Sequence, residues 1–127
     1  MNENEISHFV VDAAIEVHRT LGGPGLLESV YEEALCFELA QRGIKYERQM
    51  LVPVMYKGAQ LTTPLRLDLL IEKMVIVECK ASSLENQIWQ AQTLTYLRLT
   101  GLKLGLVINF GQRLLKNNIH RVVNGLE

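Results

Sequence analysis

Residues 65–80 read LRLDLLIEKMVIVECK, a pattern typical of two neighbouring β-strands joined by a tight turn. The runs Leu65–Ile71 and Met74–Cys79 are rich in leucine, isoleucine and valine, and only Glu72 and Lys73 separate them. Apolar runs of this length are typical of strands that lie inside a sheet. The stretch therefore predicts an antiparallel hairpin of interior strands.

Three charged residues interrupt this apolar stretch, namely Asp68, Glu78 and Lys80. With the turn centred on Lys73, Asp68 lies directly opposite Glu78, and strand alternation points Ile76, Glu78 and Lys80 to one side of the sheet. Two carboxylates that face each other need compensation, and Mg²⁺ provides it by binding one or two carboxylates together with water and phosphate oxygens. The alternative is a buried ion pair between Lys80 and one carboxylate, and a one-residue shift in register would move Asp68 to the opposite face.

Helices are predicted before and after the hairpin in the sequence. Apolar residues recur at helical spacing from Ile6 to Leu21 and from Leu27 to Leu39, and Gly22 and Gly43 follow as end signals. The inward face of the second helix is expected at Leu27, Val30, Tyr31, Ala34, Leu35 and Leu39. A third helix is expected over residues 84–100, with an inward face at Leu84, Ile88, Ala91, Leu94 or Thr95, and Leu99.

Further strands are predicted at Tyr46–Tyr56, Leu104–Phe110 and Ile119–Val123. Pro53 makes the first of them an edge strand or a bulged one. The element order predicts an α/β fold with a mixed central β-sheet flanked by helices, in which a right-handed crossover over residues 74–110 makes one strand pair parallel.

The composition is that of one soluble globular domain over residues 1–127, with 48 % apolar and 21 % charged residues and a net charge of −1. No apolar stretch approaches the roughly 20 residues of a membrane helix, and the acidic start is unlike a signal peptide. A cytoplasmic protein without a membrane partner is expected, with Cys36 and Cys79 as buried free thiols.

Charge is distributed unevenly along the chain. Residues 1–38 carry a net charge of −7, residues 39–97 one of +2 and residues 98–127 one of +4. The basic third is compatible with binding along a phosphate backbone, and equally with an ordinary solvated surface.

Two helical segments offer supporting side chains. Gln92 and Tyr96 are four residues apart and share one helix face, either as an amphipathic boundary or beside the charged strand residues. Glu28 follows the Gly23–Gly25 turn, where it either complements the helix dipole or supplies a third carboxylate to a metal ion.

The order of these residues along the chain resembles the motif of the PD-(D/E)XK nuclease superfamily. A helical Glu28 comes first and is followed by Asp68, by Glu78 to Lys80, and by Gln92 to Tyr96 on the next helix. The chain is similar in particular to the small bacterial GxxExxY proteins over roughly residues 8 to 125. The segments that carry this similarity are Gly25–Tyr31, Arg66–Leu70, Val75–Ala81, Gln92–Leu97 and Gly101–Phe110.

The resemblance implies a restriction-endonuclease-like αβββαβ core with a nuclease site. Asp68 and Glu78 would bind Mg²⁺ (or Mn²⁺), and Lys80 would position or deprotonate the attacking water. The supporting residues that it implies are the backbone carbonyl of Cys79 and the side chain of Glu28 as further metal ligands, and Gln92 and Tyr96 as groups that orient the substrate or the site.

The chain departs from the family pattern at two places. Leu67 stands where a proline often precedes the aspartate, and the run Trp89-Gln90-Ala91-Gln92 lacks the histidine that relatives often carry there. The first hypothesis is a metal-dependent nuclease acting on DNA. The alternatives are a catalytically silent nucleic-acid-binding module and a protein-interaction module, and the small size favours a homodimer or a protein partner wherever specificity is needed.

Overall fold

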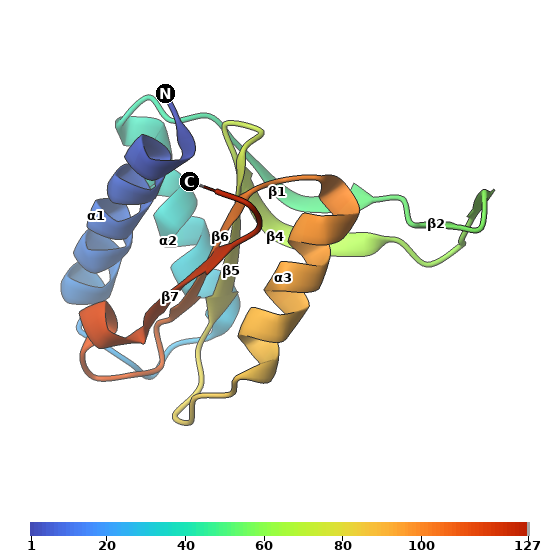
Figure 1. Ribbon diagram of the computed structural model, residues 1–127. Coiled ribbons are helices and arrows are strands. Elements are labelled where there is room, and N and C mark those ends of the chain that lie inside the picture. Colours follow the sequence, from blue (N-terminus) through green and yellow to red (C-terminus); the bar gives the residue numbers. More distant parts are fainter. Residues whose placement is uncertain (127) are drawn as a thin grey trace.

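The computed structural model describes residues 1–126, and its centre is a five-stranded sheet (Figure 1). In chain order the elements are α1 (Glu3–Leu21), α2 (Glu28–Gln41), β1 (Tyr46–Val52), β2 (Met55–Tyr56), β3 (Ala59–Gln60), β4 (Leu65–Ile71), β5 (Val75–Lys80), α3 (Ile88–Thr100), β6 (Leu104–Asn109), the short 3-10 helix η1 (Leu115–Asn118) and β7 (Ile119–Val123). The strand order is β1-β4-β5-β6-β7, and β5 and β6 are the parallel pair. The predicted α/β class, with a mixed central sheet flanked by helices, is confirmed.

Helices cover both faces of this sheet. Helices α1 and α2 lie on one face and α3 lies on the other (Figure 1), and each face has its own apolar cluster. Helix α1 begins with a capping box between Asn2 and Glu5. It ends at Gly22, as predicted. Cys36 and Cys79 are buried free thiols. Within residues 1–126, no helix is long and apolar enough to cross a membrane.

The inward face of α2 was predicted only in part. Tyr31, Leu35 and Leu39 are buried, but Leu27 is 74 % exposed and Val30 is 40 % exposed. The ring of Tyr31 stacks on Phe110 at a centroid distance of 4.8 Å, and its hydroxyl donates a hydrogen bond to the Gly23 carbonyl at 2.7 Å. These two contacts fix the rotation of the helix and turn its first apolar residues toward solvent.

The predicted inward face of α3 is wrong except at Leu94, which packs against the apolar cluster beneath this helix. The helix begins at Ile88, and it buries Thr93 and Leu97, while Leu84 and Ile88 are 76 % and 60 % exposed. A Cβ atom at Gly105 of β6 would lie only 2.6 Å from Thr93 Cγ2. The helix therefore lies close to the sheet over this glycine, and that close approach selects a face that the apolar pattern does not mark.

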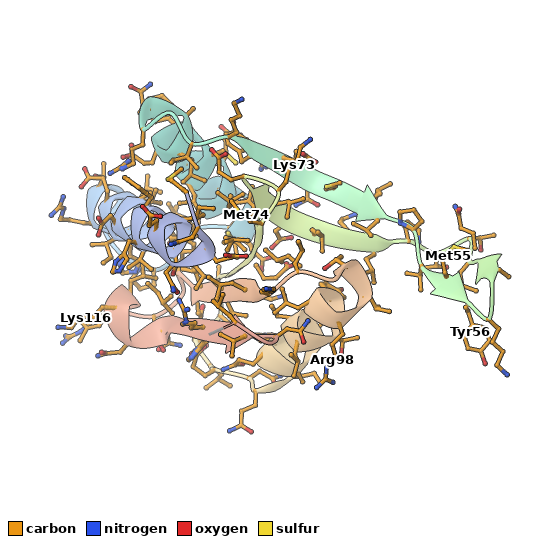
Figure 2. The ribbon with its side chains drawn as sticks, turned by 45° about the horizontal axis from the view of Figure 1, so that its top comes forward. Met55, Tyr56, Lys73, Met74, Arg98 and Lys116 are labelled. Atoms are coloured by element: carbon orange, nitrogen blue, oxygen red, sulfur yellow. The ribbon has the colours of Figure 1, made fainter. Side chains whose placement is uncertain are left out.

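The strand predicted over Tyr46–Tyr56 is present from Tyr46 only as far as Val52, and its predicted continuation to Tyr56 is wrong. Strand β1 ends at Val52, directly before Pro53, because proline has no N–H to donate to an inter-strand hydrogen bond. The chain continues into the two-stranded β2–β3 hairpin, which carries the exposed Met55 and Tyr56 away from the body of the molecule (Figure 2). Strand β1 is an edge strand, as Pro53 predicted.

The loop that follows β5 is anchored to the end of β6. The fully buried Asn109 accepts a hydrogen bond from the Ser82 N–H at 2.9 Å and donates to the Ser82 carbonyl at 3.0 Å. Asn109 also donates to Glu85, which pairs with His120 of β7. A Cβ atom at Gly111 would lie 2.3 Å from the Ser82 backbone nitrogen. Backbone packs against backbone here and leaves no room for a side chain.

We expect Gly111→Ala to lower the free energy of unfolding by roughly 1–3 kcal/mol, because a backbone clash cannot be relieved by a change of rotamer. Thermal unfolding followed by circular dichroism measures the loss. Ser83→Ala, in the exposed part of the same loop, is the matched control and is expected to unfold like the wild type. Equal melting temperatures for all three proteins would contradict the close approach.

Candidate active site

Asp68 lies where the pairing of β4 with β5 ends. Three consecutive residue pairs, the last of them Leu69 with Val77, have the predicted register. Its next step would pair Asp68 with Glu78, but the regular pairing stops before it. In place of a further ladder bond, Asp68 Oδ2 accepts a hydrogen bond from the backbone N–H of Cys79 at 2.9 Å. The carboxylate of Asp68 therefore lies in the seam between the two strands.

Strand β5 alternates as predicted. Val77 and Cys79 pack in the cluster beneath α1 and α2, whereas Ile76 packs in the cluster beneath α3. The alternation places Glu78 and Lys80 on the same side as Ile76. The charged end of β5 therefore faces α3.

Glu78 is a strongly perturbed carboxyl. It is 5 % exposed, and its Oε1 has no hydrogen-bond partner within residues 1–126. Burial raises the pKa of Glu78 to about 9, and the negative charge of Asp68 and a hydrogen bond with that carboxylate also raise it. The raised pKa favours the protonated form of Glu78 in the metal-free protein. A divalent cation beside both carboxylates would favour the ionised form instead.

Lys80 and Glu28 border the carboxylate pair. Lys80 Nζ lies 5.8 Å from the centroid of the Trp89 ring, within the range of a cation–π contact. Packing around its carboxyl raises the pKa of Glu28, while the positive charge of Lys80 lowers it and the charge of Asp68 raises it. Glu28 and Asp68 line one hollow of about 410 Å³. The third carboxylate proposed from the sequence is therefore within electrostatic reach of the pair.

The structure treats Tyr96 and Gln92 differently. Burial raises the pKa of the partly buried Tyr96, and the charges of Glu78 and Asp68 raise it further. Gln92 is exposed on α3, and within residues 1–126 no hydrogen bond joins its side chain to the other candidate residues. Tyr96 packs against the apolar cluster beneath α3, within electrostatic reach of the carboxylates, whereas Gln92 is exposed.

Sequence reasoning missed a group of three residues, Glu32, Arg48 and Gln49, of which Gln49 approaches Asp68. Glu32 is 4 % exposed, and its carboxylate accepts hydrogen bonds from Arg48 Nε at 2.9 Å and from Gln49 Nε2 at 2.8 Å. The same Gln49 nitrogen lies 3.5 Å from Asp68 Oδ1. Glu32 was the residue that the sequence could have indicated, because an acid on the inward side of a helix needs a partner.

The donor set matches a hard divalent cation. Two neighbouring carboxylates, one of them with an unpartnered buried oxygen, are the ligands that Mg²⁺ and Mn²⁺ prefer. In the part of the chain that the structure describes, no three His, Cys, Asp or Glu side chains converge on one point. Asp68 and Glu78 are thus a partial ligand set of the kind that Mg²⁺ completes with water and phosphate oxygens.

Comparison with known proteins agrees with this arrangement. A family profile described as the PD-(D/E)XK nuclease superfamily matches residues 4–122, which is most of the chain. The comparison with curated proteins found no match, and the comparison with solved structures found none either. The mixed sheet with α1 and α2 on one face and α3 on the other is consistent with a restriction-endonuclease-like core. The chain therefore belongs to the PD-(D/E)XK nuclease superfamily.

Proposed function

We propose that this protein is a metal-dependent nuclease that hydrolyses phosphodiester bonds, with DNA as the expected substrate. The observation that carries the proposal is the buried Glu78, whose unpartnered oxygen and raised pKa accompany a neighbouring Asp68 carboxylate. Burial of an uncompensated acid is costly, and perturbed groups of this kind gather at functional sites. Superfamily membership supports a nuclease-like activity at the same place.

In the proposed site, Asp68 and Glu78 hold Mg²⁺ or Mn²⁺, together with the backbone carbonyl of Cys79. Glu28, which lines the same hollow as Asp68, would reach the ion directly or through a water molecule. When bound, the ion would acidify a water molecule and offset the negative charge that develops on the phosphate.

The remaining residues act on the water and on the substrate. Lys80 orients the attacking water with its ammonium group or takes the proton that this water releases. Tyr96 and Gln92 orient the substrate strand from α3, and the hydrogen bond from the Cys79 N–H keeps Asp68 Oδ2 turned toward the seam. We place this activity in the cytoplasm. A second copy or another protein would add the surface that recognition of a sequence requires.

The first experiment is a calorimetric titration of Mn²⁺ into the metal-free protein and into Asp68→Asn, because it requires no knowledge of the substrate. We expect saturable binding by the wild type and at least about a tenfold loss of affinity in the variant, which lacks an ionised ligand. Asp12→Asn, an exposed acid on α1, is the control and should bind like the wild type.

The absence of saturable binding to the wild type would contradict a metal site in the free protein. DNA binding that weakens with salt, needs no divalent ion and survives Asp68→Asn would instead support a catalytically silent nucleic-acid-binding module. Failure to bind DNA at moderate salt would support a protein-interaction module.

A further inference from the structure

The ladder between β1 and β4 is interrupted beside Asp68. The pair Arg48–Leu69 and the pair Met50–Leu67 have the same register, yet the pair between them, Gln49 with Asp68, is missing. Gln49 has a φ of +54°, in the left-handed region that glycine and asparagine tolerate best. A glutamine in this conformation inside a strand calls for a local cause.

The interruption changes the faces to which the neighbouring side chains point. Leu67 packs in the apolar cluster beneath α3, whereas Leu69 packs in the cluster beneath α1 and α2. In a regular strand, residues two apart point to the same face. The backbone between them is therefore turned at Asp68, and this turn allows the carboxylate to enter the β4–β5 seam, where it accepts the Cys79 N–H.

The side chain of Gln49 occupies the space between two carboxylates. Its Nε2 donates to Glu32 Oε1 at 2.8 Å and lies 3.5 Å from Asp68 Oδ1. The other oxygen of Glu32 accepts from Arg48 Nε at 2.9 Å, so the charge of this buried acid is balanced. Arg48 fixes the Glu32 carboxylate through its second oxygen. The hydrogen bond from Gln49 to the first oxygen then fixes the direction of the Gln49 amide.

We propose that Gln49 is a positioning residue that orients Asp68 for the metal ion, and that Glu32 and Arg48 hold Gln49 in place. This inference rests on the proposed function of the Asp68–Glu78 pair. Gln49 approaches Asp68 Oδ1 while the Cys79 N–H holds Oδ2, so both oxygens are directed before any ion arrives. A neutral amide directs the Asp68 carboxylate without neutralising the negative charge that attracts a cation. The positive charge of Arg48 pairs with Glu32 and not with Asp68.

The test is Gln49→Gly, because glycine accepts the positive φ without strain. The substitution removes the whole side chain, including the amide that donates to Glu32 and approaches Asp68. Two measurements are made, the affinity for Mn²⁺ by calorimetry and the exchange rate of the Cys79 amide proton in the metal-free protein by NMR. We expect about tenfold weaker Mn²⁺ binding, as is typical when a partner of a metal ligand is lost. We also expect faster exchange at Cys79.

Lys73→Gly is the matched control, since Lys73 has a φ of +58° in the exposed β4–β5 turn. It should leave both measurements unchanged. Unchanged Mn²⁺ affinity and unchanged exchange at Cys79 in Gln49→Gly would overturn the positioning role and leave only a backbone role. If the wild type binds no Mn²⁺ but Gln49→Gly still shows faster exchange at Cys79, Gln49 orients Asp68 and the proposed metal-dependent function is contradicted. Failure of the positioning role and failure of the proposed function therefore give different results.

Discussion

Replacing Glu78 with Gln is expected to make the metal-free protein more stable at pH 9 and, at the same time, to abolish its saturable binding of Mn²⁺. Both effects have one cause. In the absence of a cation, a buried carboxyl beside the Asp68 carboxylate is costly to ionise, whereas the proposed metal centre needs that ionised form. Glutamine has nearly the same shape, carries no charge and cannot become an anionic ligand.

The sign of the pH dependence follows from the two pKa values of Glu78. The unfolded chain releases this proton near pH 4.5, and the folded protein keeps it up to about pH 9. Between these values the folded state binds one proton more, so the unfolding free energy of the wild type falls as pH rises, by on the order of 1 kcal/mol per pH unit. This contribution is complete below pH 4.5 and is lost by about pH 9. Glu78→Gln lacks it.

Urea unfolding at pH 5, 7 and 9 in the presence of a chelator measures this difference. The stability curves of wild type and Glu78→Gln should diverge as pH rises, while Glu33→Gln, whose side chain is 80 % exposed, should follow the wild type. Added Mn²⁺ should then stabilise the wild type by mass action but not Glu78→Gln. Parallel curves for wild type and Glu78→Gln would show that Glu78 is ionised in the metal-free protein.

The hairpin of residues 65–80 could be predicted from the sequence because its determinants are local. The apolar runs identify the strands, and the two polar residues between them set the register of the pairs from Ile71–Val75 to Leu69–Val77. The actual second strand is Val75–Lys80, one residue later than the predicted Met74–Cys79. Boundaries shift by a residue at strand ends without moving the facing pairs.

The faces of the helices were harder to predict because they depend on distant contacts. The sequence pattern of α3 favours Leu84 and Ile88, but the close approach of Thr93 to Gly105 selects another face. In α2, the stacking of Tyr31 on Phe110 has the same effect. A hydrophobic pattern compares residues that are close in the sequence. It therefore does not reveal a glycine or an aromatic partner that lies about ten to eighty residues away along the chain.

Within the candidate site, strand alternation predicted the side of Glu78 and Lys80 but not the environment of Asp68. A regular strand would have directed Asp68 to one face of the sheet, whereas the turned backbone opposite Gln49 directs it into the seam. The positive φ of Gln49 has no local sequence signal, because glutamine has no preference for that conformation. The contacts of Asp68 with its neighbours could therefore be identified only from the structure.

Lys80→Ala is expected to lower the turnover of DNA by about 10²–10⁴-fold, the usual contribution of a group that positions or accepts a proton. The affinity for Mn²⁺ should change little, because an ammonium group does not bind a cation. Cleavage of plasmid and single-stranded DNA in Mn²⁺, with calorimetry on the same samples, measures the two effects. Lys73→Ala, in the exposed β4–β5 turn, is the control and should behave like the wild type.

Lys80→Arg separates the two roles that Lys80 can have. Arginine keeps the positive charge beside the carboxylate pair but does not give up its proton in proteins. If Lys80 orients the water by charge, Lys80→Arg should recover part of the activity that Lys80→Ala loses; if Lys80 takes the proton, both variants should be equally inactive. A parallel loss of Mn²⁺ affinity and turnover in Lys80→Ala would contradict either role, since it would mean that Lys80 supports the carboxylates and not the water.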